Sequence, residues 1–93
     1  MAIDTNDIIY VNDEEIINLI LRGNKAAYSE IIKRYQNLVF SIAQSIVGNF
    51  YIAEEITQDT FICGYMNLSK VRDKSRLRPW LCTTARNKAY NVL

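Results

Sequence analysis

The chain contains no histidine, and its 93 residues include only two cysteines, Cys63 and Cys82. Protein zinc sites are usually built from histidine and cysteine at short spacings, so a conventional metal centre is not expected. We interpret the two thiols as small, buried apolar side chains in a reducing compartment. Without histidine or a glycine-rich phosphate loop, the common pairs of nucleophile and general base also have no candidate. The sequence therefore argues against an enzyme and predicts no bound cofactor.

Residues that interrupt helices are also rare, since the chain has three glycines and one proline. Apolar residues recur at helical spacing instead, which favours helices over many short strands. No apolar run is long enough to span a membrane, and residues 1–15 lack the basic and apolar parts of a signal peptide. These features predict one helical domain that stays in the cytoplasm without membrane insertion.

The net charge is only +1, but it is distributed unevenly along the chain. Residues 1–59 carry nine acidic and four basic side chains, a net of −5. Residues 60–93 carry one acidic and seven basic side chains, a net of +6. This asymmetry indicates two different partner surfaces, of which the basic one suits a polyanion.

Capping residues and apolar periodicity divide the chain into about four helices. Asn12 and Glu15 form a capping-box pattern, and Pro79 suits a first helical turn, where its missing N–H is not needed. The expected fold is an all-α, compact bundle in a single domain over residues 12–93, after a loosely ordered leader over residues 1–11. Whether the apolar end of this leader packs on the domain is left open. The expected helices run from about Asn12 to Gly23, from Asn24 to Gly48, from Asn49 to Leu68, and from Ser75 or Arg76 onward, with a polar, basic loop at 69–75.

Three of these helices carry an apolar stripe that is expected to form the core. In chain order the stripes are Ala27, Tyr28, Ile31, Ile32, Tyr35, Leu38, Val39, Ile42, Ala43 and Ile46; then Ile52, Ala53, Ile56, Thr60 and Cys63; then Leu77, Leu81, Ala85, Ala89 and Val92. The third helix has a second stripe that mixes acidic, amide and apolar side chains, and this mixture fits a solvated face and a protein-docking face equally well. The residues of this second stripe are Glu55, Gln58, Asp59, Ile62 and Met66.

Trp80 lies away from the inward stripe of the last helix, on a face that also carries Thr83, Thr84 and Asn87. The indole either covers the edge of the bundle or is available for binding. Threonine and asparagine can hydrogen-bond base edges, neighbouring Arg and Lys can neutralise phosphates, and an indole can stack on an unpaired base. The basic loop before this helix is either a solvated connector or a segment that grips phosphates. Together these features favour a surface for single-stranded or melted DNA.

Several short motifs, in this order and spacing, resemble the second conserved region of bacterial sigma factors, and most closely the extracytoplasmic-function group. The resemblance covers roughly residues 16–93. It rests on LRGNKAAY at 21–28, IKRYQ at 32–36, AEEITQDTF at 53–61, Trp80-Leu81 and Ala85-Arg86-Asn87. Each motif is weak alone, and their combination is specific.

The resemblance implies two binding surfaces. One docks on the clamp helices, a coiled coil of the RNA polymerase β′ subunit, and the other recognises and helps melt the promoter −10 element by holding a flipped base of the non-template strand. The residues implied in polymerase binding are Glu55, Gln58 and Asp59, with Phe61, Ile62 and Tyr65 near them. The residues implied in DNA binding are Lys70, Arg72, Lys74, Ser75, Arg76, Arg78, Trp80, Thr83, Thr84 and Asn87.

The chain also departs from the pattern of the family. Primary sigma factors have aromatic residues at the positions of Thr83 and Thr84, so weaker melting and stricter promoter choice are expected. Pro79 replaces a small polar residue, which removes one hydrogen bond to DNA. Family members also carry a second domain that reads the −35 element, so we expect this chain to be the N-terminal domain of a longer protein. The resemblance also implies an anti-sigma factor that covers the two binding surfaces. The alternative is a helical antagonist that avoids DNA, although the absence of acids over 74–93 argues against it.

Overall fold

The computed structural model describes residues 11–93, and 86% of it is helical. These residues contain four α-helices, three short 3₁₀ turns and no strand, so the prediction of an all-α bundle is confirmed. The expected leader, apart from Val11, lies outside the described residues. Val11 itself is half-buried against the core.

Helix α1 spans Asp13–Leu21 and begins and ends where local signals place it. The side chain of Asn12 accepts a hydrogen bond from the Glu15 N–H at 2.9 Å, which satisfies one of the free donors of the first turn. Acidic residues in that turn lie at the positive end of the helix dipole. Its buried face consists of Ile16, Ile17 and Ile20.

Helix α2 spans Tyr28–Val47 and starts later than predicted. A 3₁₀ turn, η2, occupies Lys25–Ala27. Asn24, which was expected to begin the helix as its capping residue, makes no side-chain capping hydrogen bond, so that prediction is wrong. The tight turn redirects the chain from α1 into α2 and buries Ala27. At the other end Gly48 has a φ of 66° and donates its N–H to the Gln44 carbonyl at 2.9 Å, which confirms the predicted stop.

Helix α3 spans Phe50–Met66, with the Asn49 side chain accepting from the Ile52 N–H at 3.1 Å. The helix ends two residues before the expected end at Leu68. The side-chain amide of Asn67 caps the end of the helix by donating to the Cys63 carbonyl at 2.8 Å. Leu68, the next residue, is buried in the core.

The segment predicted as an irregular loop contains two 3₁₀ turns, η3 at Leu68–Lys70 and η4 at Lys74–Arg76. Asp73 caps η4 by accepting from the Ser75 N–H at 3.1 Å, a local bond that periodicity does not reveal. Helix α4 then spans Leu77–Val92, with Pro79 in its first turn as expected. Val92 is exposed rather than inward-facing, because it lies in the last turn, beyond the packed length of the helix.

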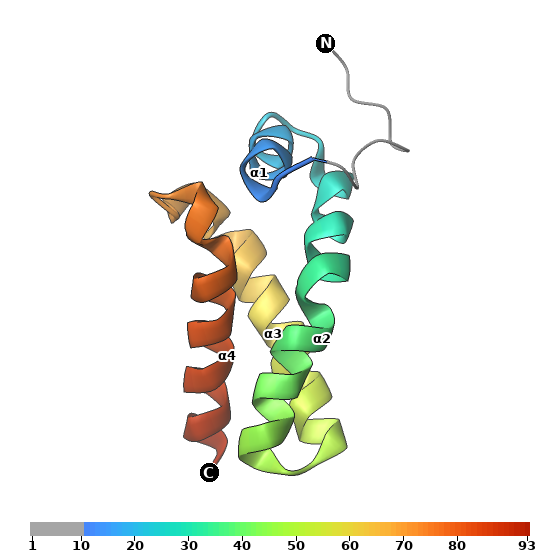
Figure 1. Ribbon diagram of the computed structural model, residues 1–93, viewed down its shortest axis with the longest axis vertical. Helices are drawn as coiled ribbons and strands as arrows, with labels where there is room; N and C mark the ends of the chain where they lie inside the picture. Colours follow the sequence, from blue (N-terminus) through green and yellow to red (C-terminus); the bar gives the residue numbers. More distant parts are fainter. Residues whose placement is uncertain (1–10) are drawn as a thin grey trace.

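Helices α2, α3 and α4 pack side by side, and α1 lies across the end of the bundle where α2 and α4 begin (Figure 1). The core has two parts. The larger part joins α1 to the other helices and to Leu68 of η3, and the smaller part fills the far end around Ala43, Ile56 and Ala89. Helix α1 also contacts η3 and η4, so the segment between α3 and α4 rests on it.

Candidate functional site

The outward face of α3 carries the mixed stripe that the sequence indicated. Glu55, Gln58, Asp59, Ile62 and Met66 are all exposed, and the exposed fractions of Ile62 and Met66 are 59% and 72%. A solvated helix face does not usually present two large apolar side chains beside acids. The exposure therefore favours docking over simple solvation.

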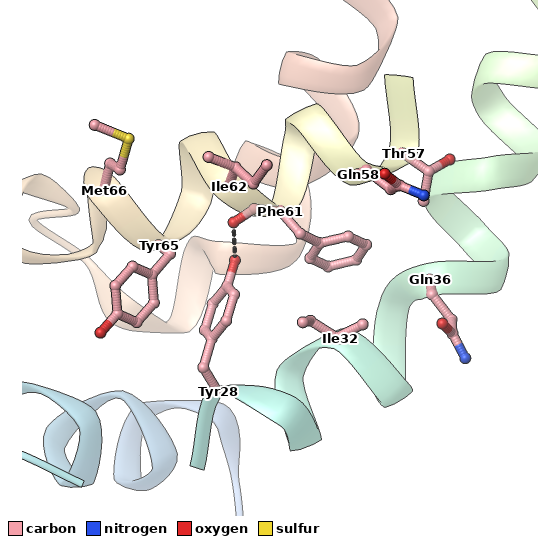
Figure 2. Close-up of a pocket in the computed structure, with 9 residues that line it drawn as sticks. All are labelled: Tyr28, Ile32, Gln36, Thr57, Gln58, Phe61, Ile62, Tyr65 and Met66. Atoms are coloured by element: carbon pink, nitrogen blue, oxygen red, sulfur yellow. Dashed lines mark hydrogen bonds between the residues drawn. The ribbon is translucent and has the colours of Figure 1, made fainter. Parts of the chain in front are cut away.

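Beside this face, α2 and α3 enclose an apolar groove of about 490 Å³ (Figure 2). Phe61 points across from α3 towards α2 and is only 5% exposed, so it belongs to the core and forms a wall of the groove. The Tyr28 hydroxyl donates to the Phe61 carbonyl, and the Tyr28 ring meets Tyr65 edge-on at 5.1 Å between centroids. Burial, followed by the neighbouring Cys63, raises the pKa of Tyr28, so its hydroxyl stays protonated as a donor.

The structure divides the residues implied in polymerase binding between two hollows on either side of α3. Gln58, Phe61, Ile62 and Tyr65 line the groove against α2. Glu55 and Asp59 line a separate hollow against α4, which also includes Lys88. The outward face of α3 forms the ridge between the two hollows. All of the residues implied in polymerase binding except Phe61 are therefore exposed and can be reached by a partner from one side.

A second surface forms where the loop meets the first turns of α4. Its hollow, about 440 Å³, is lined by residues from both segments. Five of the residues implied in DNA binding meet there: Lys70, Arg72, Arg76, Trp80 and Thr83. Val71, Asp73 and Pro79 complete the lining, and no sequence pattern indicated a role for the first two. The arrangement joins cations, an aromatic ring and a hydroxyl within one hollow.

Asp73 is the one acidic group that lines this hollow, and it has a structural task. Its carboxylate accepts hydrogen bonds from both the backbone N–H and the hydroxyl of Ser75. These bonds, with a smaller contribution from Arg76, lower the pKa of Asp73. The carboxylate thus organises the turn that carries the surrounding cations.

The other residues implied in DNA binding lie outside this hollow. Lys74 and Thr84 are half-buried, and Asn87 is exposed further along α4. Arg78 lies two positions before Trp80, which places it on a different side of the helix, and its charge acts on Tyr35 of α2. Ser75 is held by Asp73. The structure therefore brings together half of the implied set.

Trp80 is half-buried, so part of its ring covers the edge of the bundle and part is available for binding. One part packs on the core beside Gly64 of α3, where a β-carbon added to the glycine would lie 3.5 Å from the indole. The remainder faces the hollow. Gly64 was not singled out from the sequence, although a glycine inside a helical pattern is a recognised sign of close packing.

Residues 11–93 bring together no group of three potential metal ligands. Both cysteines in this range are free, and each is half-buried rather than fully buried as predicted, because Cys63 and Cys82 lie at the edges of the inward faces of their helices. Within the same range, no helix has the length and apolarity needed to cross a membrane.

Comparison with known proteins identifies a family for these features. The family model of Sigma-70 region 2 matches residues 31–93. The RNA polymerase sigma-H factor of Pseudomonas aeruginosa is 28% identical over 81 residues, covering 87% of this chain and 42% of that protein. The ECF RNA polymerase sigma factor SigW of Bacillus subtilis is 27% identical over 71 residues, covering 76% of this chain and 38% of that protein. The ECF RNA polymerase sigma factor SigM of the same organism is 34% identical over 58 residues, covering 62% of this chain and 35% of that protein.

The chain therefore spans less than half the length of these relatives. No solved structure matches it significantly. The family match extends over both the α3 face and the basic hollow, because each lies within residues 31–93. The chain belongs to the Sigma-70 region 2 family, in the group of extracytoplasmic-function RNA polymerase sigma factors.

Proposed function

We propose that this domain binds core RNA polymerase and recognises and helps melt the promoter −10 element when transcription starts. The observation that supports this most is the basic hollow, whose lining combines Lys70, Arg72 and Arg76 with Trp80. The cations suit phosphates of a single strand, and the half-exposed indole suits a base that has left the stack. Thr83 adds a hydroxyl able to hydrogen-bond a base edge.

The polymerase half of the proposal places the β′ clamp helices on the outward face of α3. Glu55, Gln58 and Asp59 provide polar and charged contacts there, and Ile62 and Tyr65 provide apolar ones. Phe61 contributes through the wall of the groove, because little of its own surface is accessible. A central apolar area with polar groups around it is the usual composition of a protein interface.

The remaining parts of the proposal concern the whole protein. Its relatives are more than twice as long as the matched segment, and we propose that a further domain reading the −35 element completes this protein. We also propose a cytoplasmic location and control by an anti-sigma factor that covers the same surfaces. A helical antagonist that never binds DNA is the competing function, and the DNA experiment below separates the two.

Trp80→Ala is expected to weaken binding of a single-stranded −10 oligonucleotide of the non-template sequence. Loss of one stacked base costs about 1–3 kcal/mol, which corresponds to roughly 5- to 150-fold in affinity. Arg72→Ala is expected to lower both the affinity and its salt dependence, since one phosphate contact is lost. Fluorescence anisotropy at low salt measures both quantities.

Lys33→Ala is the matched control for this experiment, because Lys33 is an exposed cation on α2 and does not line the basic hollow. It changes the net charge as Arg72→Ala does and should leave binding nearly unchanged. Circular dichroism checks that Trp80→Ala remains folded, since part of the ring packs on the core. Equal affinity of all four proteins would exclude the hollow as the DNA site, whereas no binding by the wild type would favour the antagonist.

The polymerase half is tested by capture of the domain on isolated β′ clamp helices. Gln58→Ala combined with Glu55→Lys is expected to abolish capture, because it removes an amide and reverses a charge on the outward face of α3. Both side chains are exposed, so the fold should be unaffected. Capture that is absent in the wild type, or unchanged in the variant, would contradict this half of the proposal.

A further inference from the structure

Three aromatic rings gather at the turn between α2 and α3, beyond the residues assigned so far. Phe40 meets Phe50 edge-on at 5.3 Å between centroids, and Phe50 meets Tyr51 in the same way at 5.5 Å. Phe40 is half-buried and packs on the smaller part of the core. Phe50 and Tyr51 are 55% and 79% exposed. Phe40 therefore anchors the rings of Phe50 and Tyr51 on the core, while much of the apolar area of these two rings remains exposed to water.

These rings continue the polymerase-docking face rather than forming a separate patch. Tyr51 precedes Glu55 by four residues and Gln58 by seven, a spacing that places all three on one side of a helix. Gln58 also lines both the large apolar groove and a smaller hollow of about 290 Å³ next to Phe40 and Phe50. The hollowed strip between α2 and α3 thus extends from Met66 to Phe50, the full length of α3, which is about 25 Å at 1.5 Å per residue.

The charge of this strip indicates the chemistry of its occupant. The residues that line this strip include one acid, Glu54, and no lysine or arginine, and the exposed acids Glu55 and Asp59 lie on the outward face beside it. This charge disfavours a polyanion on the strip, whereas the basic hollow formed by residues 70–83 suits one. The fitting partner is an elongated protein element that presents apolar side chains with basic ones beside them.

We propose that Phe50 and Tyr51 form the far end of the polymerase-docking surface and hold an apolar side chain of the clamp helices there. This inference rests on the proposed binding of polymerase through α3. Aromatic side chains are frequent sites of concentrated binding energy, and rings already ordered by Phe40 lose little freedom on binding. Tyr51 in addition offers a hydroxyl to a basic or amide group of the partner.

The test is the affinity of the full chain for bacterial core RNA polymerase. Tyr51→Ser and the double variant Phe50→Ser with Tyr51→Ser are compared with the wild type. Both are expected to bind at least about tenfold more weakly, the size of effect seen when an interface aromatic is removed. Tyr51→Ser alone leaves the contact between Phe40 and Phe50 in place, so its result does not depend on the stability of the turn.

Tyr90→Ser is the matched control, since Tyr90 is a similarly exposed aromatic (58%) on α4. Its affinity should equal that of the wild type. If Tyr51→Ser binds as tightly as the wild type while Gln58→Ala with Glu55→Lys does not bind, the inference is overturned and the proposed function stands. If the wild type itself does not bind polymerase, the proposed function fails first. Dimerisation of the free chain that depends on Tyr51 would also overturn the inference, because a second copy would then be the occupant.

Discussion

At the scale of single residues, Gly64 is a position where α3 and α4 approach each other closely. A β-carbon placed there would lie 2.9 Å from the hydroxyl oxygen of Tyr28 and 3.1 Å from a methyl carbon of Leu81. Both side chains are buried, and the Tyr28 hydroxyl is held by its bond to the Phe61 carbonyl. Neither can therefore move away without disturbing the core.

Gly64→Ala is expected to lower the free energy of unfolding by about 1 kcal/mol. Overpacking of a core costs about 1–3 kcal/mol, and the better helix propensity of alanine offsets roughly 1 kcal/mol of that cost. Urea denaturation measures the change, and the fluorescence of Trp80, the only tryptophan of the chain, reports on the displaced contact. Gln58→Ala places alanine at an exposed position of the same helix and should be nearly neutral; a Gly64→Ala protein as stable as this control would contradict the close packing.

Residue-level features were predictable from the sequence only where the interaction is local. Asn12 and Asn49 lie next to the helix starts that they cap, so their role follows from neighbours in the chain. The hydrogen bond between Tyr28 and Phe61 joins residues 33 positions apart. The need for a glycine at position 64 depends on side chains of α2 and α4 that pack against it. No local pattern contains that information.

At the scale of elements, α1 supports the surface proposed to bind DNA. Its buried isoleucines share a core with Leu68 and Leu77, which flank the loop. Its N-terminal end is held on α2, where the Asp13 carboxylate pairs with Arg34 at 3.0 Å and accepts the Tyr35 hydroxyl. Arg34 also pairs with Glu30 at 3.2 Å. The position of the loop thus depends on a helix that precedes the matched family region.

The sequence identified which side of α2, α3 and α4 faces the core, but not which helix each side meets there. For that reason the residues of the outward face of α3 were named correctly as one exposed stripe, while its neighbouring groove was not foreseen. Tyr28, Ile32 and Gln36 of α2 form the opposite wall of that groove, and helical periodicity marks the first two simply as core. The basic residues of the loop and of the start of α4 show the same limit, since only the fold separates Arg72 and Arg76, which line the hollow, from Arg78, which does not.

At the scale of the whole molecule, the attachment of α1 makes stability depend on pH in the alkaline range. Burial, followed by the hydrogen bond to Asp13 and the charge of its carboxylate, raises the pKa of Tyr35 from 10 to about 12, although Arg34 and Arg78 act in the opposite direction. A tyrosine with a raised pKa keeps its proton in the folded protein after the unfolded chain has lost its own. Its contribution to stability is therefore complete below pH 10 and is lost as the pH rises through 12.

The free energy of unfolding is thus expected to fall more steeply between pH 10 and 12 for the wild type than for Tyr35→Phe. The variant starts from a lower value at about pH 8, because it lacks the hydroxyl that bonds to the Asp13 carboxylate, a loss of about 1.5–3 kcal/mol for a hydrogen bond to a charged group. It has no proton to release at this position, so the two curves should converge as the pH rises. Urea denaturation at several pH values across this range measures both curves, and the titration of lysines and other tyrosines is common to the two proteins. Parallel curves would show that the contact between Tyr35 and Asp13 does not hold α1 on the bundle, and the support that α1 gives to the loop would then rest on its apolar face alone.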